Sequence, residues 1–83
     1  MLTMTIGEAV RLRILELCQE HDLTVNHLCT LCGVTQSTVN NIVNRRNKSA
    51  TVSTIKKLCD GLDMTIQEFF ASPLFDNLEQ EIK

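Results

Sequence analysis

The sequence predicts a small all-α domain built from five helices. Three observations lead to this fold class. Glycine and proline number only three and one in 83 residues, too few for the turns of an all-β fold. Apolar residues recur at the three- and four-residue spacing of a buried helix face. A threonine suited to capping a helix N-terminus comes before each of five apolar segments.

Five threonines mark the expected helix starts. Each follows an apolar residue and precedes another four positions later, the spacing of a hydrophobic staple. Two of them also have a glutamate three residues on, as in a capping box. These threonines are Thr5, Thr24, Thr35, Thr51 and Thr65.

The first helix is expected over about residues 6–21. Its buried face is formed by Ile6, Val10, Ile14, Leu17 and Cys18. A second helix is expected over about 25–32. Gly33 follows it and suits the left-handed conformation that ends many helices.

The third helix is expected over about residues 36–44, followed by the polar, basic loop 45–49. The fourth spans about 52–62 and the fifth about 66–71. Pro73 could open one more turn, because proline is tolerated at the first helical position. Leu74, Phe75, Leu78 and Ile82 form an apolar stripe on the acidic tail.

Charge is segregated along the chain although the net charge is only −2. Residues 23–59 carry five lysines and arginines and no acid, whereas residues 60–83 carry six acids and one lysine. A basic block of this kind is typical of phosphate contacts, with ordinary surface scatter as the alternative.

Length and hydropathy exclude several classes of protein. With 83 residues the chain forms one domain and offers little material for the deep pocket of an enzyme. It has neither a membrane-spanning apolar run nor the pattern of a signal peptide, so a cytoplasmic location is expected. Its three phenylalanines are too few for a single-strand stacking platform.

A short joint between the second and third helices predicts that they cross sharply, as in a helix-turn-helix. Residues 23–44 resemble the helix-turn-helix of Cro and phage-repressor-type regulators. The matching positions are the small Cys29, the turn glycine Gly33 and the apolar Leu28, Val34, Val39 and Ile42. Residues 51–70 are similar to the family's fourth and fifth helices, so the resemblance covers about 5–71.

The resemblance implies a compact five-helix, lambda-repressor-like DNA-binding domain over residues 1–72. Its helix-turn-helix occupies about 25–44, and 73–83 form an acidic tail. The third helix would enter the major groove. Its candidate base contacts are Gln36, Ser37, Thr38, Asn40 and Asn41. Candidate phosphate contacts are Thr35, Asn44, Arg45, Arg46 and Lys48.

The chemistry of these candidates agrees with base recognition. Glutamine and asparagine amides can pair bidentately with adenine, and hydroxyls can contact several bases. A plain polar surface helix is the alternative. The sequence departs from the family at Val25, where a glutamine usually supports the first base-contacting residue, and Asn26 or Thr24 could substitute. Whether Arg11 and Arg13 face DNA stays open at this point.

The four cysteines are expected to be reduced and to pack in the core. They are Cys18, Cys29, Cys32 and Cys59. Each lies on an apolar helix face, where a free thiol behaves as a small hydrophobic group. The C-x-x-C spacing of Cys29 and Cys32 leaves a metal or redox site as the alternative. We predict no metal, no cofactor and no catalytic residues.

These observations together predict a non-enzymatic, sequence-specific regulator of transcription that binds double-stranded DNA and acts as a repressor. One recognition helix reads few base pairs, so we expect a homodimer on a pseudo-palindromic operator. The tail stripe is either the dimer contact or part of the monomer core. The alternative function is an antitoxin-like or accessory protein that acts through a protein partner while binding its own promoter. No small-molecule ligand is evident.

Overall fold

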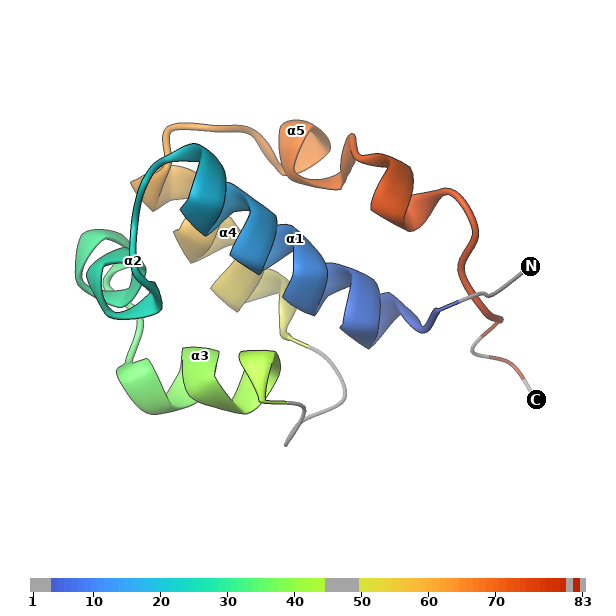
Figure 1. Ribbon diagram of the computed structural model, residues 1–83, viewed down its shortest axis with the longest axis horizontal. Coiled ribbons are helices and arrows are strands. Elements are labelled where there is room, and N and C mark those ends of the chain that lie inside the picture. Colours follow the sequence, from blue (N-terminus) through green and yellow to red (C-terminus); the bar gives the residue numbers. More distant parts are fainter. Residues whose placement is uncertain (1–3, 45–49, 81, 83) are drawn as a thin grey trace.

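Five α-helices and one short 3-10 helix make up the computed structural model, which describes residues 4–44, 50–80 and 82. They are α1 (Ile6–Glu20), α2 (Val25–Cys32), α3 (Gln36–Val43), α4 (Val52–Gly61), α5 (Ile66–Phe70) and the 3-10 helix η1 (Pro73–Phe75). Figure 1 shows α1 in the middle, α3 along one side and α5 along the opposite side. The described residues contain one isolated β-bridge, between Met4 and Leu78. The prediction of an all-α, five-helix fold is confirmed.

All five helices begin at the predicted threonines. In each case the threonine hydroxyl accepts a hydrogen bond from the backbone N–H three residues later, at 3.0–3.3 Å. The glutamates Glu8 and Glu68 complete the two predicted capping boxes by accepting from the N–H of Thr5 and Thr65. Local sequence therefore determines where each helix starts.

Three of the joints between helices share one geometry. A residue with positive φ ends the helix, and the N–H of the next residue donates to the carbonyl five positions earlier. The positive-φ residues are Gly33 (66°), Asp22 (55°) and Asp63 (55°). Gly33 fits the prediction. The two aspartates were not predicted, because aspartate tolerates this conformation without requiring it.

The core lies where the five α-helices meet. Its largest fully buried side chains are Phe69, Ile14, Leu28, Leu58, Val39 and Cys59. All four cysteines are buried and unpaired, so the core-packing prediction for them is confirmed. Gly61 of α4 allows α2 to approach closely, since a Cβ there would overlap Cys32 Sγ and lie 2.9 Å from Cys32 Cα.

The tail lies against α5 and the start of α1 (Figure 1). Phe75 packs against the core, with its ring centroid 4.9 Å from that of Phe70 and 6.4 Å from that of Phe69. The Glu79 N–H donates to the Met4 carbonyl at 2.9 Å, which joins the two ends of the chain. Ile82, by contrast, is 89% exposed.

None of the helices in the described ranges combines the length and the hydropathy that a bilayer crossing requires.

Candidate nucleic-acid interface

The orientation of α3 is set by two of its own apolar residues. Val39 and Ile42 are buried, and the α2–α3 joint at Gly33 holds the helix across the end of α2. Helical spacing therefore gathers positions 36, 37, 40, 41 and 44 on the opposite face. Gln36, Ser37 and Asn44 are exposed, and Asn40 and Asn41 are half-buried. This face carries amides and one hydroxyl and no charged side chain.

Gln36, at the start of α3, is held from α2. Its Nε2 donates a hydrogen bond to Oδ1 of Asn26. The sequence left Asn26 and Thr24 as alternatives for this supporting role. Thr24 instead caps α2 through the His27 N–H, so Asn26 is the residue that contacts Gln36. The bond fixes the Gln36 amide orientation and leaves its Oε1 and second N–H for another partner.

The N-terminus of α3 is capped by hydroxyls. The Thr38 N–H donates to Thr35 Oγ1 at 3.3 Å, and the hydroxyls of Thr35 and Thr38 are 2.7 Å apart. Thr38 is half-buried and lies at the edge of the polar face, with its hydroxyl already paired. Thr35 is exposed at the helix start, where free N–H groups and the helix dipole favour an anion.

The predicted phosphate contacts are only partly within the described residues. Asn44 lies directly after α3 and is exposed. Arg45, Arg46 and Lys48 lie outside the described residues.

Arg13 is committed to holding α5. It is buried, its Nε donates to the Phe69 carbonyl at 2.7 Å, and its Nη2 donates to the Glu68 carbonyl at 3.0 Å. Its Nη1 also pairs with Glu16. With all three guanidinium nitrogens engaged, Arg13 is a structural residue, which settles the question left open by the sequence.

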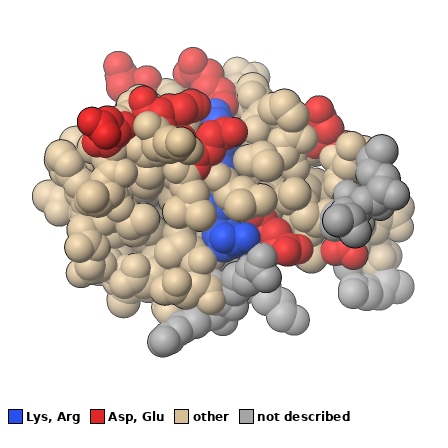
Figure 2. All heavy atoms as spheres, viewed as in Figure 1, with Lys and Arg blue, Asp and Glu red and all other residues tan. Residues whose placement is uncertain are grey.

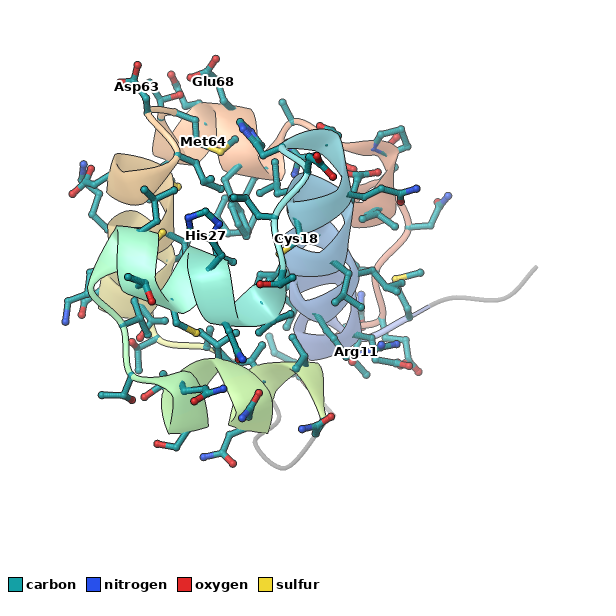
Figure 3. All side chains as sticks on the ribbon, turned by 60° about the vertical axis from the view of Figure 1, so that its left-hand side comes forward. Arg11, Cys18, His27, Asp63, Met64 and Glu68 are labelled. Carbon is teal, nitrogen blue, oxygen red and sulfur yellow. The ribbon has the colours of Figure 1, made fainter. Side chains whose placement is uncertain are left out.

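Arg11 has a different environment. It is half-buried and lies on α1 above the C-terminal end of α3 (Figure 3). The sequence left open whether Arg11 faces DNA, and the predicted site residues did not include it. Its proximity to α3 depends on how α1 packs against α3, which no local pattern contains.

Charge is distributed unevenly over the surface. Many acidic side chains gather at the end of the molecule formed by α5 and the adjoining helix ends, opposite α3, and further acidic groups lie towards the tail and beside the basic atoms between α1 and α3 (Figure 2). Asp63 and Glu68 are among them (Figure 3). Over α3 the visible surface is uncharged (Figure 2). On the face shown, a polyanion would therefore meet less repulsion over α3 than over the acidic end.

The cysteines offer no reactive group to this surface. Burial raises the pKa of all four thiols, that of Cys32 to about 11, so they are neutral at physiological pH. Within residues 4–44, 50–80 and 82, no three His, Cys, Asp or Glu side chains are placed to hold a metal ion.

Comparison with known proteins agrees with this arrangement. Residues 13–72 match the family described as the Cro/C1-type helix-turn-helix DNA-binding domain. The crystal structure of the prophage Lp1 protein 11 is similar, with 37% sequence identity and a TM-score of 0.79 over 92% of this chain and 100% of that one. The comparison with curated proteins found no match. The chain therefore belongs to the family of Cro/C1-type helix-turn-helix DNA-binding domains.

Proposed function

We propose that the protein is a sequence-specific regulator of transcription, acting as a repressor, that inserts α3 into the major groove of double-stranded DNA. The observation that carries this proposal is the uncharged amide and hydroxyl face of α3. An ordinary solvated helix face carries lysines and glutamates, whereas amides and hydroxyls match the donor and acceptor pattern of base edges. We place the DNA-binding domain at residues 1–72, with 73–83 as its tail.

Each candidate residue has a distinct role in this proposal. Gln36 contacts a base edge while Asn26 fixes the orientation of its amide. The remaining base contacts are Ser37, Thr38, Asn40 and Asn41, of which Thr38 is the least favourably placed because its hydroxyl is paired with Thr35. The backbone contacts are Thr35, Asn44, Arg45, Arg46 and Lys48. These position the helix without reading sequence.

We further propose that the protein binds as a homodimer in the cytoplasm. An eight-residue recognition helix spans only a few base pairs. Two copies on a pseudo-palindromic operator, one helical turn apart, would double the number of bases read.

The test is selection of binding sites from a random duplex library at a stated salt concentration. We expect a two-fold symmetric motif. Gln36→Ala should remove the preference at one base pair in each half-site, a loss of about 1–3 kcal/mol per contact. Asn26→Ala should weaken the same preference, because it frees the Gln36 amide. The matched control is Gln67→Ala, an exposed glutamine on α5 at the opposite side from α3 (Figure 1).

Two results would contradict the proposal. One is equal loss of preference in the Gln67→Ala control. The other is the absence of any motif, with only salt-sensitive bulk binding. That second result would favour the antitoxin-like or accessory function, because the acidic end opposite α3 offers a surface for a basic protein partner (Figure 2).

A further inference from the structure

We propose that α3 reads a half-site made of A·T base pairs, because Asn40 and Asn41 each pair with an adenine in the major groove. This inference rests on the proposed function, since it assumes that α3 lies in that groove. It adds the class of base pair that the helix recognises.

The composition of α3 departs from that of an ordinary solvated helix. Its eight residues are QSTVNNIV, and apart from the glutamine they are moderate or poor helix formers. Asparagine is unfavourable because its amide competes for backbone hydrogen bonds. The outward faces of α1 and α4 carry charged residues instead, among them Glu20, Lys56 and Lys57. The sequence of α3 thus gives up helix stability for amides and hydroxyls, as is expected where a surface recognises a ligand.

The amides of Asn40 and Asn41 have no hydrogen-bond partner among residues 4–44, 50–80 and 82. Both side chains are half-buried, so packing already restricts them and binding costs less side-chain entropy. Figure 3 shows side chains with nitrogen and oxygen tips projecting from α3 away from the rest of the molecule. Each amide therefore offers an acceptor oxygen and an N–H donor to a ligand on this side.

Adenine is the base that a carboxamide matches best. In the major groove it presents N7 as an acceptor and its N6 amino group as a donor, so one amide makes two hydrogen bonds to it. Guanine presents two acceptors and is read by arginine or lysine, whereas cytosine presents a donor and is read by aspartate or glutamate. α3 contains none of these four residue types. The pairs that its amides can hold by two hydrogen bonds are therefore A·T pairs, in either orientation.

The orientation of Gln36 favours the same base. Its Nε2 donates to Oδ1 of Asn26, which leaves Oε1 and one N–H for a base edge. One acceptor beside one donor is complementary to adenine. Against guanine, Oε1 would face the O6 acceptor and repel it. The opposite amide orientation would leave two N–H donors and suit guanine, so the contact with Asn26 adds to the preference for A·T pairs.

The first experiment measures affinity for the selected duplex after single base-pair changes. Asn40→Ala and Asn41→Ala should each remove the preference at one base pair per half-site. At those pairs, replacing A·T by G·C should weaken wild-type binding roughly five- to hundredfold. The matched control is Asn77→Ala, an exposed asparagine of the tail, which should leave every preference unchanged. A loss confined to one base pair cannot come from partial unfolding, which would weaken binding to every duplex equally.

Modified bases separate pairing in the major groove from recognition of the shape of A·T-rich DNA. 7-Deazaadenine lacks the N7 acceptor and should weaken wild-type binding roughly three- to tenfold at a contacted pair, with no further loss in the corresponding alanine variant. An inosine·cytosine pair combines the major-groove edge of G·C with the minor-groove edge of A·T, so it should weaken binding as G·C does. A diaminopurine·thymine pair changes only the minor-groove edge and should be tolerated.

The outcomes for the two proposals are distinct. The assignment of A·T pairs fails, and the proposed function stands, if the two alanine variants remove preferences for G·C pairs or remove none. It also fails if inosine·cytosine is tolerated at the contacted A·T pairs, because the preference would then come from DNA shape. If the selection returns no motif for the wild type, the proposed function and the A·T assignment both fail.

Discussion

The thiol of Cys32 lies between α2 and α4, where its Sγ donates to the Leu58 carbonyl at 3.6 Å. Burial raises its pKa to about 11 from the ordinary value of 9.0. The folded protein therefore keeps the Cys32 proton at a pH where the unfolded chain releases it. Stability from this group is complete below about pH 9 and is lost as the pH rises towards about 11.

We expect the free energy of unfolding to fall by roughly 1–3 kcal/mol between about pH 8.5 and 11, since one pKa unit corresponds to about 1.4 kcal/mol. Urea titrations across this range measure it. Because Lys56 and the other thiols also titrate, the matched comparison is Cys32→Ala, which should show a smaller decline. Identical slopes for the two proteins would exclude Cys32 as a source of the pH dependence.

Alanine substitutions at Gly33 and Gly61 should lower the stability of the fold for two different reasons. Gly33 has φ of 66° and open space where a methyl group would be added, so Gly33→Ala should cost only the left-handed conformation, about 1–2 kcal/mol. Gly61 lies in α4, where alanine normally stabilises a helix by about 1 kcal/mol. Here the methyl group would meet Cys32, so we expect Gly61→Ala to destabilise the fold by about 1–3 kcal/mol. Urea midpoints measure both, and a stabilised Gly61→Ala would contradict the close α2–α4 approach.

At the scale of elements, α5 depends on α1 for its C-terminal carbonyls. Five residues are too few for a helix to be stable alone. Arg13 satisfies the carbonyls of Glu68 and Phe69 near its end, where a cation also favours the helix dipole. The predicted helix over 66–71 is therefore correct in place, but the contact that holds it comes from a residue 55 positions away.

Replacing Arg13 should destabilise the protein without changing the salt dependence of its binding to DNA. We expect Arg13→Met to lower the free energy of unfolding by about 2–4 kcal/mol, because two carbonyls lose a charged donor. Arg13→Lys should recover little, since one ammonium cannot reproduce the fork. Thermal melts measure the stability. At a temperature where the variant is folded, its salt slope on duplex DNA should equal that of the wild type, and a reduced slope would contradict the structural assignment of Arg13.

At the scale of the whole molecule, the C-terminal tail contacts both α5 and the N-terminal end of the chain. Truncation after Ser72 removes the Phe75 ring from Phe69 and Phe70 and the Glu79–Met4 hydrogen bond. We expect the melting temperature to fall by about 5–15 °C, because a lost contribution of about 1–2 kcal/mol shifts a domain of this size by several degrees per kcal/mol.

The matched control for the truncation is Ile82→Ser, which changes the exposed end of the stripe and should leave the melting temperature unchanged. Sedimentation of both variants reports the oligomeric state. A truncated chain that melts like the wild type but no longer dimerises would show that the tail is a dimer contact instead of part of the monomer core.

Much of the fold could be predicted because its signals are local. The five threonine caps act on N–H groups three residues away, and Gly33 acts on its own backbone. The side chains on α3 could also be assigned to a face, since Val39 and Ile42 identify the buried one. Helix ends were less certain: the first helix ends at Glu20 rather than 21, and the joints at Asp22 and Asp63 carry no specific signal.

The sequence by itself determined the helices, their order and the polar character of α3, because capping and helical periodicity act within a few residues. Only the tertiary structure decided the partners of side chains that reach between helices. It joined Gln36 to Asn26, committed Arg13 to α5 and placed Arg11 beside α3. The physical reason is that these contacts depend on the distances and angles between packed helices, which the shapes of many core side chains set together.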